Sequence, residues 1–157
     1  MPELPEVEHV KRGIEPYAIN TTINKITFSE NVKKGKEDNR ETIIKGMTLD
    51  SFQRLTEGYT ITKIERRSKY IVFYINRDSE QRILISHLGM AGGFFVVDHL
   101  EQITVPNYRK HWQVIFELDN GKKLIYSDIR RFGEIRNVSS FDAYPVSYTH
   151  LRAHETR

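Results

Sequence analysis

The chain has 157 residues, of which 24 are Lys or Arg and 21 are Asp or Glu, so its formal net charge is +3. It contains no cysteine, which excludes disulfides, a thiolate nucleophile and a cysteine-ligated zinc site, and fits a reducing cytoplasm. No apolar run approaches the length of a membrane span, and the acidic start is unlike a secretion signal. These features predict a cytoplasmic protein of about one domain without a membrane partner.

The N-terminal segment predicts an amphipathic helix from about Pro5 to Tyr17. Apolar residues recur there at helical spacing, and polar residues occupy the other faces. Pro5 suits the first helical position, and the acidic Glu6 and Glu8 favour the positive end of a helix. Taken alone, this opening is an ordinary helix start.

The segment after this helix is predicted to contain short elements. Alternation of apolar and polar residues predicts a strand over 20–28, whereas the polar stretch 29–41 predicts a loop. Two isoleucines at 43–44 favour a short strand. Thr48 is a candidate N-cap for a short helix over 49–55.

The second half of the sequence predicts strands separated by turn signals. Their expected ranges are 60–67, 70–75, 82–87, 92–97, 111–118, 122–126 and 132–138. The Asn120-Gly121 pair marks a hairpin turn between two of them. About eight short strands and an N-terminal helix predict a mainly β fold with flanking helices, a two-layer antiparallel β-sandwich.

The first three residues form the first chemical motif. If Met1 is removed, Pro2 becomes the N-terminal residue and carries a free secondary amine, with the Glu3 carboxyl group beside it. An amine next to a proton-transferring carboxyl group is suited to Schiff-base chemistry on a sugar aldehyde carbon. The alternative is that both residues only begin the helix.

A second motif, Arg66-Arg67-Ser68-Lys69-Tyr70, lies at a junction between two predicted strands. Three cations in four residues repel one another unless an anion lies among them, which favours a phosphate ligand. The alternative is a plain hairpin whose charges are solvated.

The third motif is the glycine-flanked segment His87-Leu88-Gly89-Met90-Ala91-Gly92. Glycines on both sides predict a tight exposed loop, where a core residue would be out of place. Met90 is unbranched and polarizable, so it is suited to enter a stack of bases. The alternative is a buried methionine beside a turn.

The fourth motif is the segment Asp128-Ile129-Arg130-Arg131-Phe132-Gly133. In an extended loop, residues two apart point the same way, so we expect Arg130 and Phe132 to project together and Arg131 to point elsewhere. An arginine can hydrogen-bond an orphaned base, and a phenylalanine can stack on bases or wedge between them. The alternative is a charged turn that ends in a core phenylalanine.

In their order and spacing, the four motifs resemble the formamidopyrimidine-DNA glycosylases over residues 1–144. The resemblance implies a bacterial enzyme of base-excision repair, both DNA glycosylase and abasic-site lyase, that acts as a monomer on damaged double-stranded DNA at the nucleoid. Leu4 fits the branch that removes oxidised purines such as 8-oxoguanine and formamidopyrimidines, whereas the endonuclease-eight branch usually has Gly there. The departures from the family's usual residues are minor and lie at Ser68, Ala91 and Ile129.

The resemblance also implies roles for individual residues. Pro2 would attack the sugar C1′ and Glu3 would transfer protons, so that β- and δ-elimination follow. Glu6 would support this site, and Lys69 would hold a phosphate near the lesion. The residues implied to contact DNA are His87 and Arg131 at phosphates, Met90 and Phe132 as wedges, and Arg130 at the base opposite the lesion. His111 is a further candidate for DNA contact, because it belongs to the basic cluster 109–111.

We therefore expect residues 1–145 to be the N-terminal catalytic domain. Residues 146–157 resemble translated sequencing-adapter DNA, so His150 and His154 in this tail are discounted as a metal pair. The printed sequence lacks the family's helix–two-turn–helix domain and zinc finger, so we expect no metal cofactor in this chain and an impaired activity. The competing hypothesis is a non-catalytic β-sandwich module that binds nucleic acid or a protein partner.

Overall fold

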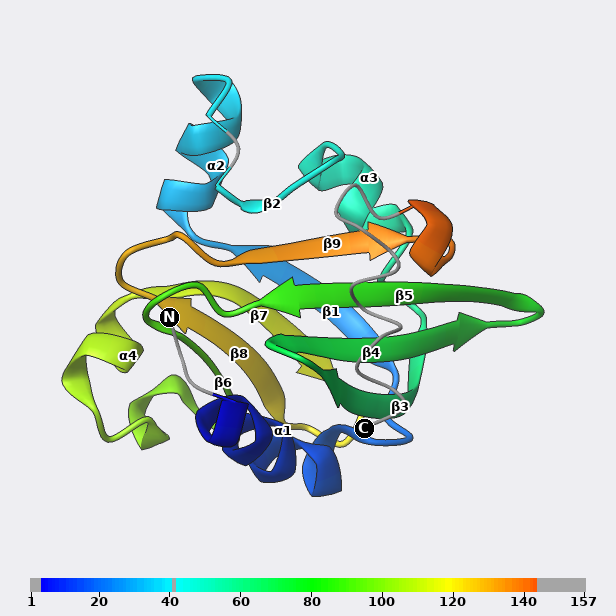
Figure 1. The fold of residues 1–157 in the computed structure, drawn as a ribbon, viewed down its shortest axis with the longest axis horizontal. Helices are drawn as coiled ribbons and strands as arrows, with labels where there is room; N and C mark the ends of the chain where they lie inside the picture. Colours follow the sequence, from blue (N-terminus) through cyan, green and yellow to red (C-terminus); the bar gives the residue numbers. More distant parts are fainter. Residues whose placement is uncertain (1–3, 41, 144–157) are drawn as a thin grey trace.

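Two stacked β-sheets form the body of the protein, and helices lie around them (Figure 1). The structure is a computed structural model that describes residues 4–40 and 42–143. The strands are β1 (Ile23–Phe28), β2 (Ile43–Ile44), β3 (Thr60–Arg67), β4 (Tyr70–Arg77), β5 (Glu80–His87), β6 (Gly92–Val97), β7 (Trp112–Leu118), β8 (Lys123–Asp128) and β9 (Glu134–Val138). The helices are α1 (Leu4–Ala18), α2 (Glu30–Glu37), α3 (Leu49–Arg54) and α4 (Pro106–Lys110), with 3-10 turns η1 (Leu100–Gln102) and η2 (Phe141–Ala143).

The two sheets differ in size. One has four strands in the order β1-β7-β8-β6, and the other has five in the order β2-β9-β5-β4-β3. Within the described residues, the named strands pair antiparallel except β2 with β9, which are parallel. A parallel pair needs a long connection, which the chain between β2 and β9 supplies. The predicted mainly β, two-layer sandwich is thus confirmed, but a fully antiparallel arrangement is wrong for this one pair.

The main core lies between the two sheets. Phe73 of β4 meets Phe94 of β6 edge to face, with ring centroids 5.3 Å apart. Phe52 of α3 packs near Phe116 of β7, with centroids 6.4 Å apart. A second, smaller buried cluster lies on the other face of the five-stranded sheet and consists of Tyr70, Val72, Ile83, Ile85 and Val138. Because side chains alternate along a strand, burial on both faces explains why β4 is apolar along most of its length.

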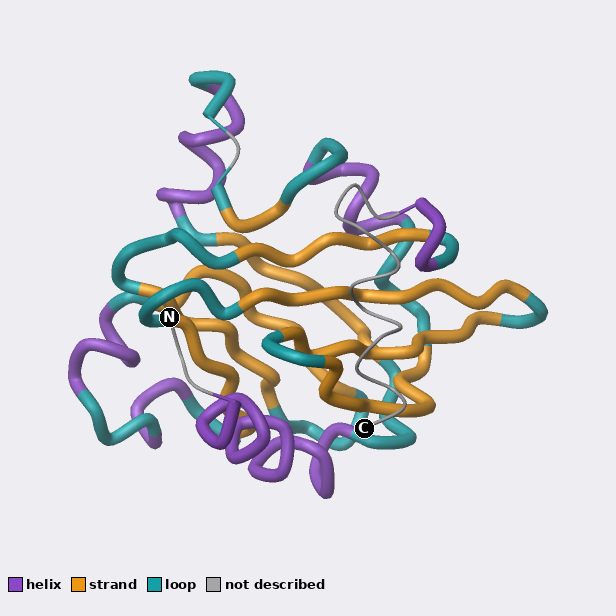
Figure 2. Tube along the Cα trace, in the orientation of Figure 1, coloured by secondary structure: helices purple, strands orange, loops and turns teal. Residues whose placement is uncertain are grey.

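Helix α1 closes one open side of the sandwich. Its Val7, Ile14 and Ala18 are buried. The helix contacts β6 and β3, which are edge strands of the two different sheets. In Figure 2 it lies beside the strands, at the lower side of the view. The predicted N-terminal helix is confirmed to within one residue at each end.

The segment 29–41, predicted as a loop, contains helix α2, so that prediction is wrong. Ser29 is its N-cap, because its Oγ accepts a hydrogen bond from the Val32 backbone nitrogen at 3.2 Å. Only a narrow stripe that includes Val32 and Gly35 is buried, and the polar remainder conceals the helix in the sequence. The short helix α4 was also missed; it begins at Pro106, a residue that suits a first helical position.

Most other predicted elements are confirmed, and one strand begins later than predicted. The Oγ1 of Thr48 accepts a hydrogen bond from the Ser51 backbone nitrogen at 3.1 Å and caps α3. The hairpin between β7 and β8 turns at Gly121, whose φ of 85° is unfavourable for other residues. Strand β9 starts at Glu134, two residues later than predicted, because residues 129–133 form a separate loop.

Candidate functional site

Two loops at one end of the sandwich carry four of the predicted site residues. They connect β5 to β6 (88–91) and β8 to β9 (129–133), and both lie at the left of Figure 1. A Cβ atom at Gly89, whose φ is 65°, would lie only 2.6 Å from the backbone nitrogen of Gly133. The two loops are therefore in backbone contact, which requires glycine at this position.

Asp128, at the end of β8, holds the second loop from inside the protein. Its side chain is fully buried. Its Oδ1 accepts hydrogen bonds from the backbone nitrogens of Arg130 and Arg131 at 3.1 and 2.9 Å. Its Oδ2 accepts from the backbone nitrogen of Gly133 and from the Tyr126 hydroxyl, both at 2.9 Å. These four donors compensate the cost of burying a carboxylate.

Tyr126 fills the space between the two loops. Its hydroxyl oxygen would lie 1.9 Å from a Cβ atom at Gly133 and 2.4 Å from one at Gly92. Burial, followed by the charge of Asp128, raises the pKa of the Tyr126 phenol well above its ordinary value, so the phenol stays protonated and donates. Gly92 and Gly133 thus leave room for a buried Tyr126–Asp128 pair that supports both loops.

Two large apolar side chains project outward from these loops. Phe132 is 62% exposed and Met90 is 53% exposed, although large apolar residues usually avoid water. The guanidinium carbon of Arg130 lies 5.3 Å from the centroid of the Phe132 ring. The expectation that Arg130 and Phe132 project together is confirmed. The alternatives of a buried methionine and a core phenylalanine are wrong.

Arg131 turns away from its two neighbours. Its φ of 57° lies in the left-handed region, which is unusual for an arginine. Arg131 instead lines a small hollow together with Lys34 and Gly35 of α2. The loop therefore directs consecutive side chains to two different sides.

The cationic junction between β3 and β4 is partly neutralised by the protein itself. The guanidinium of Arg66 contacts the Glu8 carboxylate at 2.9 Å, and that of Arg67 contacts Glu65 at 2.6 Å. The hypothesis that these cations require an external anion is therefore wrong for the two arginines. Lys69 is exposed and forms no ion pair within the described part of the chain.

The two carboxyl groups at this junction are held in the ionised form. Burial raises the pKa of Glu8, but hydrogen bonds from Arg66 and Arg12 outweigh it and lower the pKa below its ordinary value. The pKa of Glu65 is lowered in the same way, against its burial, by hydrogen bonds from Tyr74 and the neighbouring arginine. Both ion pairs are thus present at neutral pH.

His87 lies at the same end of the five-stranded sheet, opposite Tyr70 of β4. Its Nδ1 accepts a hydrogen bond from the Gly89 backbone nitrogen at 3.0 Å, and its ring meets Tyr70 edge to face. Burial is the main reason that the pKa of His87 is lowered; the charge of Lys69 acts in the same direction and that of Glu134 opposes it. The imidazole is therefore neutral with its proton on Nε2, which can donate to an anion.

The remaining predicted residues lie in different places. His111 is half-buried, and its backbone oxygen accepts a hydrogen bond from the Asp128 nitrogen at 3.0 Å, so it adjoins the loops. Glu6 is exposed on α1 and lines a groove of about 500 Å³ between α1 and β6. Pro2 and Glu3 lie outside the described residues.

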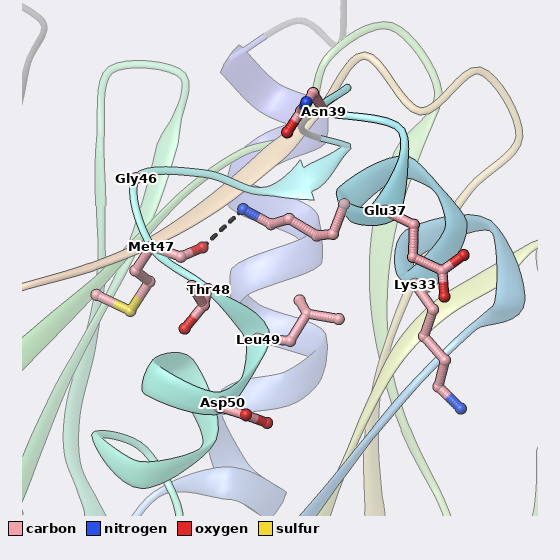
Figure 3. Close-up of a pocket in the computed structure, with 9 residues that line it drawn as sticks. Lys33, Glu37, Asn39, Gly46, Met47, Thr48, Leu49 and Asp50 are labelled. Carbon is pink, nitrogen blue, oxygen red and sulfur yellow. Dashed lines mark hydrogen bonds between the residues drawn. The ribbon is translucent and has the colours of Figure 1, made fainter.

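A cavity of about 910 Å³ lies between α2 and α3 and is lined by none of the predicted site residues (Figure 3). The Lys36 Nζ donates a hydrogen bond to the Met47 carbonyl oxygen across this cavity at 2.6 Å.

Among the described residues, no cluster of His, Asp or Glu could hold a metal ion. No helix in the described ranges is long and apolar enough to cross a membrane. The candidate site is instead a protruding surface, since its apolar and basic side chains point outward.

Sequence reasoning missed the two residues that organise this surface, Tyr126 and Asp128. The signal that could have revealed them is the repeated glycine at both loops, because closely spaced glycines indicate a bulky buried neighbour.

Comparison with known proteins gives one consistent result. The family model described as "Formamidopyrimidine-DNA glycosylase N-terminal domain" matches residues 1–135. A formamidopyrimidine-DNA glycosylase of Streptococcus thermophilus is 41% identical over 133 residues, which is 85% of this chain and 41% of that protein. A Streptococcus agalactiae protein of the same name is 36% identical over 146 residues, covering 92% of this chain and 46% of that one.

The fold is also similar to solved structures. The Lactococcus lactis Fpg bound to DNA that contains an abasic site matches with a TM-score of 0.67 and 28% identity, over 88% of this chain and 45% of that chain. Another L. lactis Fpg structure, with DNA containing Fapy-dG, matches with a TM-score of 0.66 and 29% identity, over 88% and 44%. The chain thus spans less than half the length of the curated relatives described here.

Proposed function

This chain belongs to the formamidopyrimidine-DNA glycosylase family, and we propose that it carries the N-terminal catalytic part of a DNA glycosylase with abasic-site lyase activity. Its proposed substrate is double-stranded DNA that contains an oxidised purine, such as 8-oxoguanine or a formamidopyrimidine. The proposal draws support from the names of its relatives and from the damaged DNA bound in the similar L. lactis structures.

The observation that carries this proposal is the pair of exposed apolar side chains on two interlocked loops. A base within a duplex cannot be attacked at its sugar, so the nucleotide must leave the stack, at a cost of a few kcal/mol. Met90 and Phe132 protrude from loops that are fixed by backbone contact, so they can fill the gap without reorganising. Arg130, beside Phe132, offers donors to the base that has lost its partner.

Basic groups around these side chains suit the DNA backbone. Lys69 and the neutral His87 lie at the same end of the five-stranded sheet, and each has a donor available. Arg131 belongs to the second loop, and His111 adjoins it. Phosphate contacts of this kind fix the position of a protein on DNA without reading its sequence.

The proposed reaction begins at the chain terminus. The neutral amine of Pro2 attacks C1′ as the bond from C1′ to the damaged base breaks, and the proton that the amine loses goes to the departing base. Glu3 then gives a proton to the sugar ring oxygen as the C1′–O4′ bond breaks, which opens the ring and leaves an iminium. An α-amine titrates near pH 8, so a useful fraction is unprotonated at neutral pH. The resulting iminium withdraws electrons and makes the C2′ protons acidic, so that first the 3′ and then the 5′ phosphate is eliminated. Glu6 would support this site from α1.

The test is cleavage of an abasic-site duplex by the chain after mass spectrometry has confirmed loss of Met1. We expect Glu3→Gln to slow cleavage by about 10²-fold or more, since it removes the proton-transferring group. Pro2→Gly should also slow it, because a primary amine replaces the secondary one. Glu101→Gln is the matched control, because it removes the same negative charge as Glu3→Gln from an exposed residue of η1. It should leave the cleavage rate unchanged.

Equal rates for all three variants and the unaltered chain would remove the enzymatic proposal. DNA binding without any cleavage, with Met1 gone, would favour the competing hypothesis of a binding module.

A further inference from the structure

A small hollow lies between α2, the segment that follows it and the 129–133 loop. Its volume is about 120 Å³. Pockets for whole small molecules are larger, about 300–1,000 Å³, so this hollow suits a single small group. The residues that line it are Asn31, Lys34, Gly35, Arg40, Thr42 and Arg131.

The lining has the composition of an anion site. Among the described residues that line it, Lys34, Arg40 and Arg131 are cationic and none carries a carboxylate. Arg40 is held by Asp38 at 2.9 Å, whereas Lys34 and Arg131 form no ion pair within the described residues. Two free cations at one hollow repel each other, and an anion between them removes that repulsion.

The fold assembles this hollow through the same carboxylate that supports the loops. The Asp128 Oδ1 fixes the backbone nitrogen of Arg131 at 2.9 Å, in the left-handed conformation that turns its side chain toward α2. On the other side, a Cβ atom at Gly35 would lie 2.7 Å from both the Arg40 carbonyl oxygen and the Thr42 hydroxyl. Glycine there lets α2 pack closely against the following segment and brings Lys34 to the hollow.

We infer that Lys34 and Arg131 together bind one backbone phosphate of the DNA strand whose bases meet Arg130 and Phe132. The inference rests on the proposed function, because Arg131 stands between those two residues in the chain. The amide of Asn31 provides a further donor at the hollow. Helix α2, concealed in the sequence by its polar composition, then becomes part of the DNA-binding surface.

The neighbouring lysine offers a matched control. Lys33 belongs to the same helix, but it pairs with Glu30 at 3.6 Å and lines the large cavity on the other side. Lys34→Gln and Lys33→Gln therefore remove the same charge from adjacent exposed positions. Because both side chains are exposed, neither change should alter the unfolding temperature, which a thermal melt checks.

The experiment measures binding of the chain to a duplex with a tetrahydrofuran abasic-site analogue, by fluorescence anisotropy, across a series of salt concentrations. Each phosphate that a protein neutralises contributes about 0.9 to the slope of log K against log salt. Losing one contact therefore weakens binding about eightfold at about 0.1 M salt. We expect the double variant Lys34→Gln/Arg131→Gln to lose about this much affinity, each single variant to lose a measurable part of it, and Lys33→Gln to lose none.

Two results would overturn the inference. One is a Lys34→Gln variant that binds DNA like Lys33→Gln. The other is a double variant whose slope falls by about 1.8, which indicates two separate phosphates. If one of these results is found and the unaltered chain still binds and cleaves abasic DNA, only this inference fails. If the unaltered chain neither binds nor cleaves abasic DNA, the proposed function fails as well.

Discussion

Asp128 links the interior of the protein to the exposed side chains of the interface. One oxygen holds the backbone of Arg130 and Arg131, and the other holds Gly133 and the Tyr126 hydroxyl. A carboxylate can accept all four bonds because it has only acceptor sites. The direction in which Arg130, Phe132 and Arg131 project thus depends on one fully buried group.

The change Asp128→Asn tests this dependence. An asparagine side chain has one acceptor oxygen, whereas the aspartate has two. At least one of the donors that bond Asp128, such as the backbone nitrogen of Gly133, is then left without an acceptor in the interior. We expect the free energy of unfolding, measured in urea, to fall by about 1–3 kcal/mol and abasic-DNA affinity to fall with it. Asp78→Asn, in the exposed turn between β4 and β5, should change stability by less than about 0.5 kcal/mol. Similar losses in both variants would contradict the role given to Asp128.

His87 makes stability depend on pH in a defined direction. Its pKa is lowered in the folded protein, mainly by burial, so the unfolded chain binds its proton more tightly. The stabilising contribution is therefore complete above the unfolded pKa of about 6.5 and is lost as pH falls through the lower folded pKa. We expect the free energy of unfolding to decrease between about pH 7 and pH 5.

The variant His87→Asn isolates that effect. An asparagine can still accept the hydrogen bond from Gly89 through its side-chain oxygen, but it does not titrate. Its stability should therefore vary less with pH over this window than that of the unaltered protein. Parallel pH profiles for the two proteins would show that His87 is not the titrating group.

At the scale of elements, the two loops behave as one unit because their backbones touch. Gly89 packs against the backbone of Gly133, and Tyr126 packs against Gly92 and Gly133. We therefore expect a displacement of one loop to move Met90 and Phe132 together.

Gly133→Ala tests the coupling. The added Cβ would lie 1.9 Å from the Tyr126 hydroxyl, so we expect a loss of about 1–3 kcal/mol in unfolding free energy, or more. Adding Tyr126→Phe removes the closest atom and should recover part of the loss, a non-additivity that a double-mutant cycle measures. Gly13→Ala, where a Cβ meets nothing within 4 Å, should instead stabilise α1 by about 0.5–1 kcal/mol. A tolerated Gly133→Ala would mean that the loops are not in tight contact.

Elements with a strong local pattern could be predicted from the sequence, whereas elements defined by tertiary contacts could not. The alternation in β3 and the cap of α3 at Thr48 are local signals, and both predictions hold. Helix α2 was missed because its buried stripe includes Val32 and a glycine, which give almost no apolar periodicity. The start of β9 was misplaced because the bonds to Asp128 override the β-forming character of Phe132.

At the scale of the whole molecule, the sandwich brings together motifs that are distant in the sequence. Tyr70 pairs with His87 across β4 and β5, which places the turn with Lys69 at the same sheet end as the loop with Met90. Strand β9 adds the loop with Phe132 beside them. The sequence motifs could identify these residues, but their common location follows from strand register, which no single motif contains.

The covalent bond between the chain terminus and DNA is the central claim, and borohydride trapping tests it most directly. The chain, with Met1 confirmed absent, is incubated with a duplex that contains 8-oxoguanine, reduced with borohydride, and digested to locate the cross-link. We predict an adduct on Pro2, in a lower yield than for the longer Streptococcus thermophilus relative. No adduct, or an adduct carried by Lys69 in place of Pro2, would contradict the account.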